Sequence, residues 1–168
     1  AEKLKLRPYQ LQGAKWLEGL SFNGLNGILC DEMGLGKTIQ GIALIAHLKH
    51  HRMRGNFLIV APLSTLQNWI NEFARWCPGI KTLLYHGSKE ERAALRHQHM
   101  GMSATSRNGV SRIERDMTKS DDFPIVVTSY DIILRDIGNF RKFKWLYLIV
   151  DEGHRLKNKD CRLMHALK

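Results

Sequence analysis

The chain has 168 residues, of which 43% are hydrophobic, a length and composition that suit one globular domain and exclude a chain that is disordered throughout. Its 26 lysine and arginine residues exceed its 16 acidic residues and leave a formal net charge of +10. Such an excess favours anionic partners, with nucleic acid or acidic protein tails first, and a basic surface kept for solubility is the alternative.

Cysteine, histidine and apolar patterns exclude further classes. The three cysteines, Cys30, Cys77 and Cys161, form no CxxC pair, as in a protein with free thiols in a reducing compartment. No histidine stands beside a cysteine pair at zinc-ligand spacing, so we interpret the histidines as surface residues. The longest dense apolar run, residues 145–150, is far too short to span a bilayer, and we expect a soluble protein without a membrane partner.

Short apolar runs alternate along the chain with segments of helical period. The runs expected to form strands are residues 26–30, 57–61, 82–86, 124–128 and 145–150. The segments expected to form helices are residues 37–49, 65–76 and 88–97, the last two opened by capping boxes at Ser64 with Gln67 and at Ser88 with Glu91. Several runs are apolar at consecutive positions, which is typical of a parallel sheet covered on both faces. The alternation therefore predicts a three-layer α/β/α domain with a mostly parallel sheet.

One stretch, residues 100–122, breaks this alternation. It is rich in Gly, Ser, Thr, Arg and Asp and has no clear period. We interpret it as a surface insertion, mobile or partly disordered, that is either tolerated or a contact loop for a partner.

The expected strand at residues 26–30 runs into a glycine-rich loop and then into an expected helix. The loop consists of Asp31, Glu32, Met33, Gly34, Leu35, Gly36, Lys37 and Thr38. Gly34 and Gly36 let the backbone curl and approach phosphate oxygens, while inward N–H groups and the helix N-terminus attract negative charge. We expect Lys37 to reach the β and γ phosphates of ATP and the Thr38 hydroxyl to bind Mg²⁺.

This loop departs from the P-loop pattern G-x-x-x-x-G-K-T at its first position, where Asp31 replaces glycine. The alternative is a glycine-rich turn with an incidental Lys-Thr. A strand before the loop, a helix after it and an intact Gly-Lys-Thr favour the phosphate-binding interpretation.

An acidic pair follows the last apolar run. Asp151 and Glu152 come directly after residues 146–150, which would deliver both carboxylates to the carboxyl edge of the sheet, where ligands bind in doubly wound folds. Asp151 is expected to hold Mg²⁺, and Glu152 to orient or deprotonate the attacking water. His154 is a candidate for sensing the γ-phosphate and coupling it to the rest of the protein.

The order of these motifs resembles the Swi/Snf-type ATPases of superfamily two. The resemblance rests on LRPYQ at residues 6–10, DEMGLGKT at 31–38, APLS at 61–64, TSY at 128–130 and DEGH at 151–154. Finer features resemble the lymphoid-specific helicase subfamily and its plant relatives, namely PLSTL at 62–66, NW at 68–69, YHG at 85–87 and DEGHRLKN at 151–158.

The resemblance implies that residues 1–168 form the N-terminal, RecA-like ATP-binding lobe of a nuclear, double-stranded-DNA-dependent ATPase that remodels nucleosomes. Gln10, with Arg7 nearby, matches the segment that reads adenine in this family, and a plain helix-start glutamine is the alternative. The residues that match the DNA-backbone-contacting segments are Pro62, Leu63 and Ser64, and then Thr128 and Ser129, although helix capping by Ser64 and Ser129 would also explain them.

The resemblance also implies partners outside this chain. These are a second RecA-like lobe that supplies an arginine to the nucleotide, duplex DNA and histones. The basic segments 141–144 and 155–159 either extend the DNA or histone surface or form a solvated face. Two other functions stay open, a strand-separating DNA or RNA helicase and an idle nucleic-acid or histone docking module.

Overall fold

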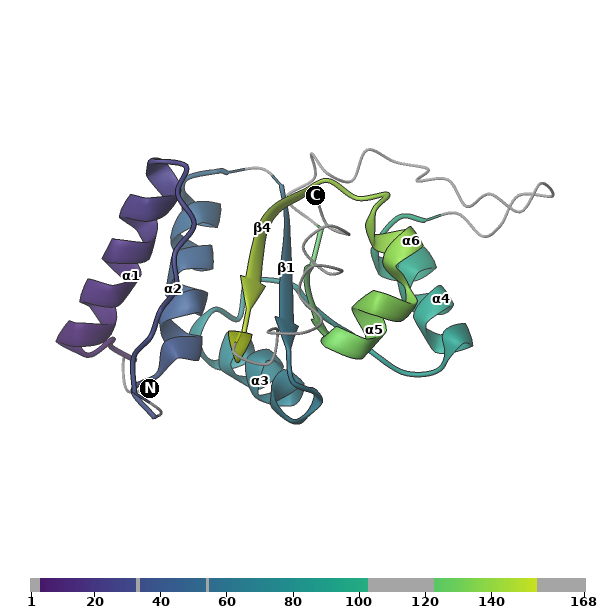
Figure 1. Ribbon diagram of the computed structural model, residues 1–168, viewed down its shortest axis with the longest axis horizontal. Helices are drawn as coiled ribbons and strands as arrows, with labels where there is room; N and C mark the ends of the chain where they lie inside the picture. The colour runs from purple at the N-terminus through teal and green to yellow at the C-terminus, as the bar shows by residue number, and fades with distance from the viewer. Residues whose placement is uncertain (1–3, 33, 54, 103–122, 154–168) are drawn as a thin grey trace. The chain divides into compact units, whose positions relative to one another are not determined.

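The computed structural model describes residues 4–32, 34–53, 55–102 and 123–153 (Figure 1). The chain divides into two compact units. The first unit comprises Ala1–Met53 and Asn71–Gly79, and the second comprises Arg54–Ile70 and Ile80–Lys168. Among the helices that the structure describes, none combines the length and apolar character needed to cross a bilayer.

The first unit is built on two packed helices, α1 (Pro8–Phe22) and α2 (Lys37–His50). The sequence patterns did not predict α1, which begins with Pro8 in its first turn and with the Gln10 side chain accepting the Arg7 N–H at 3.0 Å. The helices approach closely at Gly13, where an added Cβ would lie 1.8 Å from Gln40 Oε1. The predicted helix 37–49 is confirmed as α2.

The second unit contains a four-stranded, all-parallel sheet. The strands are β1 (Asn56–Ala61), β2 (Thr82–Tyr85), β3 (Ile125–Ser129) and β4 (Trp145–Val150), in the order β2-β3-β1-β4. The register aligns Ala61 with Ser129 and Val60 with Val150. Because all the strands run in one direction, the segments that follow β1, β3 and β4 leave the sheet at the same edge. The expected parallel α/β fold is confirmed.

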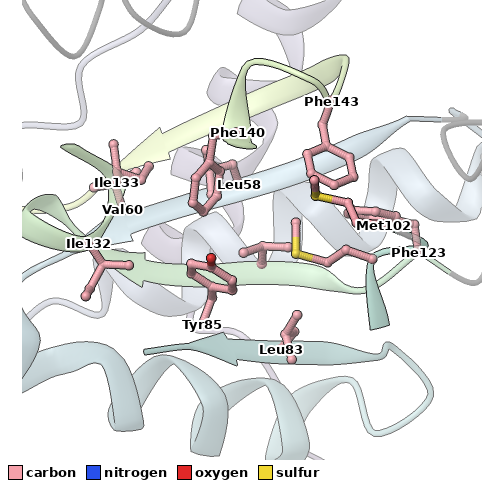
Figure 2. Close-up of a cluster of buried hydrophobic side chains, with 12 residues drawn as sticks. Leu58, Val60, Leu83, Tyr85, Met102, Phe123, Ile132, Ile133, Phe140 and Phe143 are labelled. Atoms are coloured by element: carbon pink, nitrogen blue, oxygen red, sulfur yellow. The ribbon is translucent and has the colours of Figure 1, made fainter. Parts of the chain in front are cut away.

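Helices α4 (Lys89–His99), α5 (Tyr130–Arg135) and α6 (Ile137–Phe140) lie on one side of this sheet (Figure 1). Apolar side chains from β1, β2 and β3 meet those of α5 and α6 in a buried cluster, in which the rings of Tyr85 and Phe140 lie edge to face, 5.1 Å apart (Figure 2). The cluster consists of Leu58, Val60, Leu83, Tyr85, Met100, Met102, Phe123, Val126, Ile132, Ile133, Phe140 and Phe143. Burial of this apolar surface is the main force that holds the second unit together.

Of the two predicted capping boxes, one is present at the start of a helix and the other is not. The one at Ser88 is confirmed, because the Glu91 carboxylate accepts the Ser88 N–H at 2.6 Å and the Ser88 hydroxyl accepts the Glu91 N–H at 3.2 Å. The one at Ser64 is wrong, because Ser64 lies inside a 3-10 turn, η1 (Leu63–Thr65), that leads into α3 (Leu66–Trp76). Pro62 starts that turn, and its carbonyl accepts from both the N–H and the hydroxyl of Thr65.

Two further expectations need correction. The strand predicted at residues 26–30 is wrong, because these residues have no regular secondary structure and Ile28 is 81% exposed. An apolar run alone was therefore not enough to make a strand. A strand also needs a partner to take its backbone hydrogen bonds. Met100 and Met102, which open the predicted surface insertion, are only 1% and 3% exposed, because their flexible side chains fill the apolar cluster. The rest of that prediction, residues 103–122, lies outside the described residues.

A buried ionic network ties the end of β2 to the helices beside it. The Asp136 carboxylate accepts from Tyr85 Oη at 2.5 Å, from Arg92 Nε at 2.8 Å and from Arg96 at 2.9 Å. Burial alone would raise the pKa of Asp136, but the hydrogen bonds from Arg92 and Tyr85 and the charges of both arginines outweigh it, so this pKa lies below its usual value. Burial, and then the bond to Asp136, raises the pKa of Tyr85.

We expect the Asp136→Asn substitution to destabilise the chain by about 3–5 kcal/mol, because it leaves the buried guanidinium of Arg92 and the partly buried one of Arg96 without their counter-ion. The measurement is urea unfolding of both proteins over a range of pH. The matched control is Asp131→Asn, which changes an exposed carboxylate in the first turn of α5 and is expected to cost less than about 1 kcal/mol.

The pH dependence of this difference has a defined sign. Because the pKa of Asp136 is lower in the folded state, its stabilisation is complete above the unfolded pKa of about 3.9 and is lost as pH falls through the folded pKa. The gap between wild type and Asp136→Asn should therefore narrow below about pH 4. A gap that stays constant through that acid range would contradict the assignment.

Candidate functional site

The glycine-rich loop of the first unit has the backbone that a phosphate-binding turn requires. Gly34 and Gly36 have φ angles of +85° and +81°, in the left-handed region that other residues adopt only with strain. Gly36 directly precedes α2, so the N-terminus of that helix, with its partial positive charge, ends at this loop. Thr38 is half-buried in the first turn of α2, and Met33 lies outside the described residues.

Lys37 folds back onto its own loop. Its ammonium group donates to the carbonyl oxygens of Asp31 and Glu32 at 2.8 and 2.9 Å. Both acceptors are neutral carbonyl groups, so these two bonds hold the ammonium in place without neutralising its positive charge. The helix N-terminus and this cation together make the loop suited to an anion.

Two glutamines brace the loop from the helices. Gln40, fully buried in α2, donates to Asp31 Oδ2 at 3.1 Å, and Gln10 in α1 donates to the Leu35 carbonyl at 3.2 Å. The φ angle of Asp31 is not in the left-handed region, which explains why glycine is not needed at this first position of the motif. The adenine-reading role of Gln10 and Arg7 stays a prediction. The contacts observed here place Gln10 against the loop backbone and the Arg7 N–H.

The acidic pair lies in the second unit, at the carboxyl end of β4. The Asp151 N–H donates to the Val60 carbonyl at 2.8 Å, which continues the pairing of β4 with β1 by one residue. Its carboxylate Oδ2 accepts from Trp69 Nε1 at 3.0 Å, and its carbonyl accepts from the Tyr130 hydroxyl. Glu152 is half-buried with a φ of +54°, a conformation that costs a non-glycine residue about 1–2 kcal/mol. Such strain persists where surrounding structure enforces it, and often at functional positions.

The segments that resemble DNA-contacting motifs emerge at the same edge of the sheet as Asp151. Leu63 and Ser64 are exposed after β1, whereas Pro62 is buried. Thr128 is buried in β3, and its hydroxyl donates to the Tyr85 carbonyl at 2.8 Å, so its side chain serves the fold. The Ser129 hydroxyl accepts the Ile132 N–H at 3.5 Å, which confirms Ser129 as the N-cap of α5. The DNA contacts themselves stay a prediction.

Sequence reasoning missed the two donors to Asp151. Trp69 stands 82 positions before its acceptor and Tyr130 stands 21 before it, and no local spacing rule relates an indole or a phenol to a carboxylate so far along the chain. Of the segment 141–144, Phe143 belongs to the buried cluster and its basic neighbours are exposed. His154 and segment 155–159 lie outside the described residues.

Comparison with known proteins identifies the family. The family model described as "SNF2-related domain" matches residues 9–168, and the chain therefore belongs to the SNF2-related family. This confirms the resemblance to Swi/Snf-type ATPases and the RecA-like fold that it implies.

Curated and solved relatives agree with this membership. The chain is 47% identical to the "ATP-dependent DNA helicase DDM1" of Arabidopsis thaliana over 98% of its length, and 47% identical to the human "Lymphoid-specific helicase" over 97%. It spans 20% and 18% of those two proteins. A solved structure, "Sulfolobus solfataricus SWI2/SNF2 ATPase core in complex with dsDNA", matches 98% of this chain and 29% of its own, with a TM-score of 0.75 and 29% identity.

We expect the Gly36→Ala substitution to weaken ATP binding by at least about tenfold. An alanine at position 36 would have to keep a φ of +81°, which is strained for a residue with a side chain. Its Cβ would lie 2.6 Å from Gln10 Nε2 and would displace Gln10 from the Leu35 carbonyl. Calorimetric titration of ATP measures the change.

Gly19→Ala is the matched control for this prediction. Gly19 lies inside α1 with no atom within 4 Å of an added Cβ, so the same substitution should leave ATP affinity unchanged. It should also stabilise the helix by about 0.5–1 kcal/mol. Equal ATP affinities for wild type and Gly36→Ala would show that the loop geometry is not what binds the nucleotide.

Proposed function

We propose that this chain is the ATP-binding lobe of a double-stranded-DNA-dependent ATPase that remodels nucleosomes. The observation that carries the proposal is the loop at residues 31–38. Two left-handed glycines, a helix N-terminus and the ammonium of Lys37 converge there on one short stretch of backbone. That combination suits the phosphates of a nucleotide.

Residues of this chain also suit the magnesium ion that accompanies ATP. Hydroxyl and carboxylate oxygens are the ligands that Mg²⁺ prefers, and Thr38 and Asp151 supply one of each. The hydrogen bonding of the Asp151 carboxylate fits a metal ligand. Trp69 occupies Oδ2, while Oδ1 has no hydrogen-bond partner within the described residues. The bound ion would neutralise charge on the phosphates, and Glu152 would orient or deprotonate the attacking water.

Duplex DNA is the proposed stimulating partner. Leu63 and Ser64 are exposed at the carboxyl edge of the sheet, where α5 also begins, and exposed backbone there suits phosphate contacts without sequence information. The formal net charge of +10 favours the same polyanion. One solved relative is described as an ATPase core in complex with dsDNA, which supports duplex DNA as the partner.

The remaining partners follow from family membership. A second RecA-like lobe of the same protein would supply an arginine to the transferring phosphoryl group, a contribution worth about 10³–10⁵ in rate in related enzymes. Histones are proposed because curated relatives are named as regulators of chromatin, and nuclear location goes with them. His154 is proposed to sense the γ-phosphate state.

Lys37→Ala should lower ATP affinity by at least about tenfold, because it removes charge-assisted hydrogen bonds to the phosphates. Calorimetry on the full-length protein measures this, with Lys15→Ala, an exposed lysine of α1, as the matched control. Unchanged ATP affinity in Lys37→Ala would sink the phosphate-loop assignment. An idle docking module predicts DNA binding with no ATP affinity in the wild type either.

Glu152→Gln should bind ATP normally and lower DNA-stimulated hydrolysis by about 10²–10⁴-fold. The amide keeps the shape of the side chain and the same φ requirement, but it cannot take a proton. Steady-state turnover with duplex DNA is the readout, and Glu90→Gln, an exposed residue of α4, is the control. Wild-type turnover in Glu152→Gln would remove this residue from catalysis, and stimulation by single-stranded RNA over duplex DNA would favour a strand-separating helicase.

A further inference from the structure

Asp151 is held by hydrogen bonds from two different elements of the second unit. Trp69, on α3 and only 3% exposed, donates its indole N–H to Asp151 Oδ2 at 3.0 Å. Tyr130, the first residue of α5, donates its hydroxyl to the carbonyl oxygen of the same residue. One bond therefore orients the carboxylate and the other holds the backbone that carries it.

The indole bond selects one oxygen of the carboxylate. Indole N–H can only donate, and a bond from it to an ionised carboxylate is of the stronger, charge-assisted kind. With Oδ2 engaged, Oδ1 is the oxygen available for a metal ion, and it has no hydrogen-bond partner in the described part of the chain. Partners of this kind, one step removed from a metal, fix the direction in which its ligand points.

Each donor is joined directly to a segment that we propose contacts DNA. The 3-10 turn that contains Leu63 and Ser64 runs without a break into α3, which carries Trp69. Tyr130 follows Ser129, the N-cap of α5. A displacement of either segment by a bound phosphate backbone would therefore move a donor to Asp151, because a short rigid helix carries motion along its length.

We propose that Trp69 and Tyr130 are positioning residues that couple duplex DNA, bound at residues 62–64 and Ser129, to the metal-binding carboxylate of Asp151. This inference rests on the proposed function and adds a route by which DNA acts on the nucleotide site. Because coupling between two ligands is reciprocal, ATP with Mg²⁺ must alter DNA affinity by the same factor by which DNA alters ATP affinity.

The test measures that factor by binding alone. In the full-length protein, the Kd for a duplex DNA oligonucleotide is determined with and without a non-hydrolysable ATP analogue and Mg²⁺. We expect wild type to show a ratio of at least about fivefold, and Trp69→Phe and Tyr130→Phe each to bring it within about twofold of unity. Tyr130→Phe keeps the ring and removes the hydroxyl donor, whereas Trp69→Phe removes the indole donor and leaves a smaller ring. DNA affinity without nucleotide should stay unchanged in Trp69→Phe, because Trp69 lies outside residues 62–64 and the start of α5.

Magnesium dependence provides a second readout for the indole. Trp69→Phe should raise the Mg²⁺ concentration needed for half-maximal binding of the analogue by about tenfold or more, because Oδ1 is no longer held in place. A residue that only stabilised the fold would not shift this midpoint. Tyr130→Phe is a variant on a separate element, so the coupling test does not depend on the folding of Trp69→Phe.

Trp76→Phe is the matched control. Trp76 lies on the same helix and donates its indole N–H to Glu72 Oε2 at 2.9 Å, so the substitution deletes the same kind of bond away from Asp151. Its DNA coupling and Mg²⁺ midpoint should equal those of wild type. Wild-type values of both quantities in Trp69→Phe and Tyr130→Phe would overturn the inference while leaving the ATPase proposal standing. Absence of ATP binding in the wild type would instead overturn the proposed function.

Discussion

The parallel pairing of β1 with β3 and β4 is the constraint on which the second unit depends. It ends three strands at one edge, and the register that aligns Ala61 with Ser129 and Val60 with Val150 brings their following residues together there. Asp151 extends this pairing through its bond to the Val60 carbonyl. An antiparallel strand at any of these places would have sent its carboxyl end to the opposite edge.

Positive φ angles occur just after β4 and in the glycine-rich loop. Glu152 is held at a positive φ immediately after β4, while the bonds from Trp69 and Tyr130 hold its neighbour Asp151 in place. In the first unit, the left-handed turn at residues 34–36 falls on glycines, which accept it at little cost. The difference is physical, because glycine has no Cβ to clash at a positive φ, whereas Glu152 keeps the side chain that its proposed role requires.

The Asp136 network anchors the C-terminal end of α5, the helix that begins with Tyr130. It joins Tyr85 at the end of β2 to Arg92 and Arg96 of α4, at the junction between α5 and α6. Because Tyr130 begins α5 and Asp136 follows its last residue, that short helix is held at both ends. Two arginines facing one carboxylate make a cluster that stays intact only while the carboxylate is ionised.

The sequence by itself determined the features that are local. The Gly-x-Gly-Lys-Thr loop and the capping box at Ser88 each depend on neighbours a few residues apart, so spacing and residue type were sufficient to predict them. Consecutive apolar residues also predicted the four strands, but the same pattern at residues 26–30 formed no strand, because a strand needs a partner for its backbone hydrogen bonds. Tertiary structure decided what depends on distant partners: the burial of Met100 and Met102, the exposure of Ile28, and the indole that reaches Asp151 across 82 positions. A periodic pattern shows that a segment has an apolar face, but only packing determines which distant surface covers it.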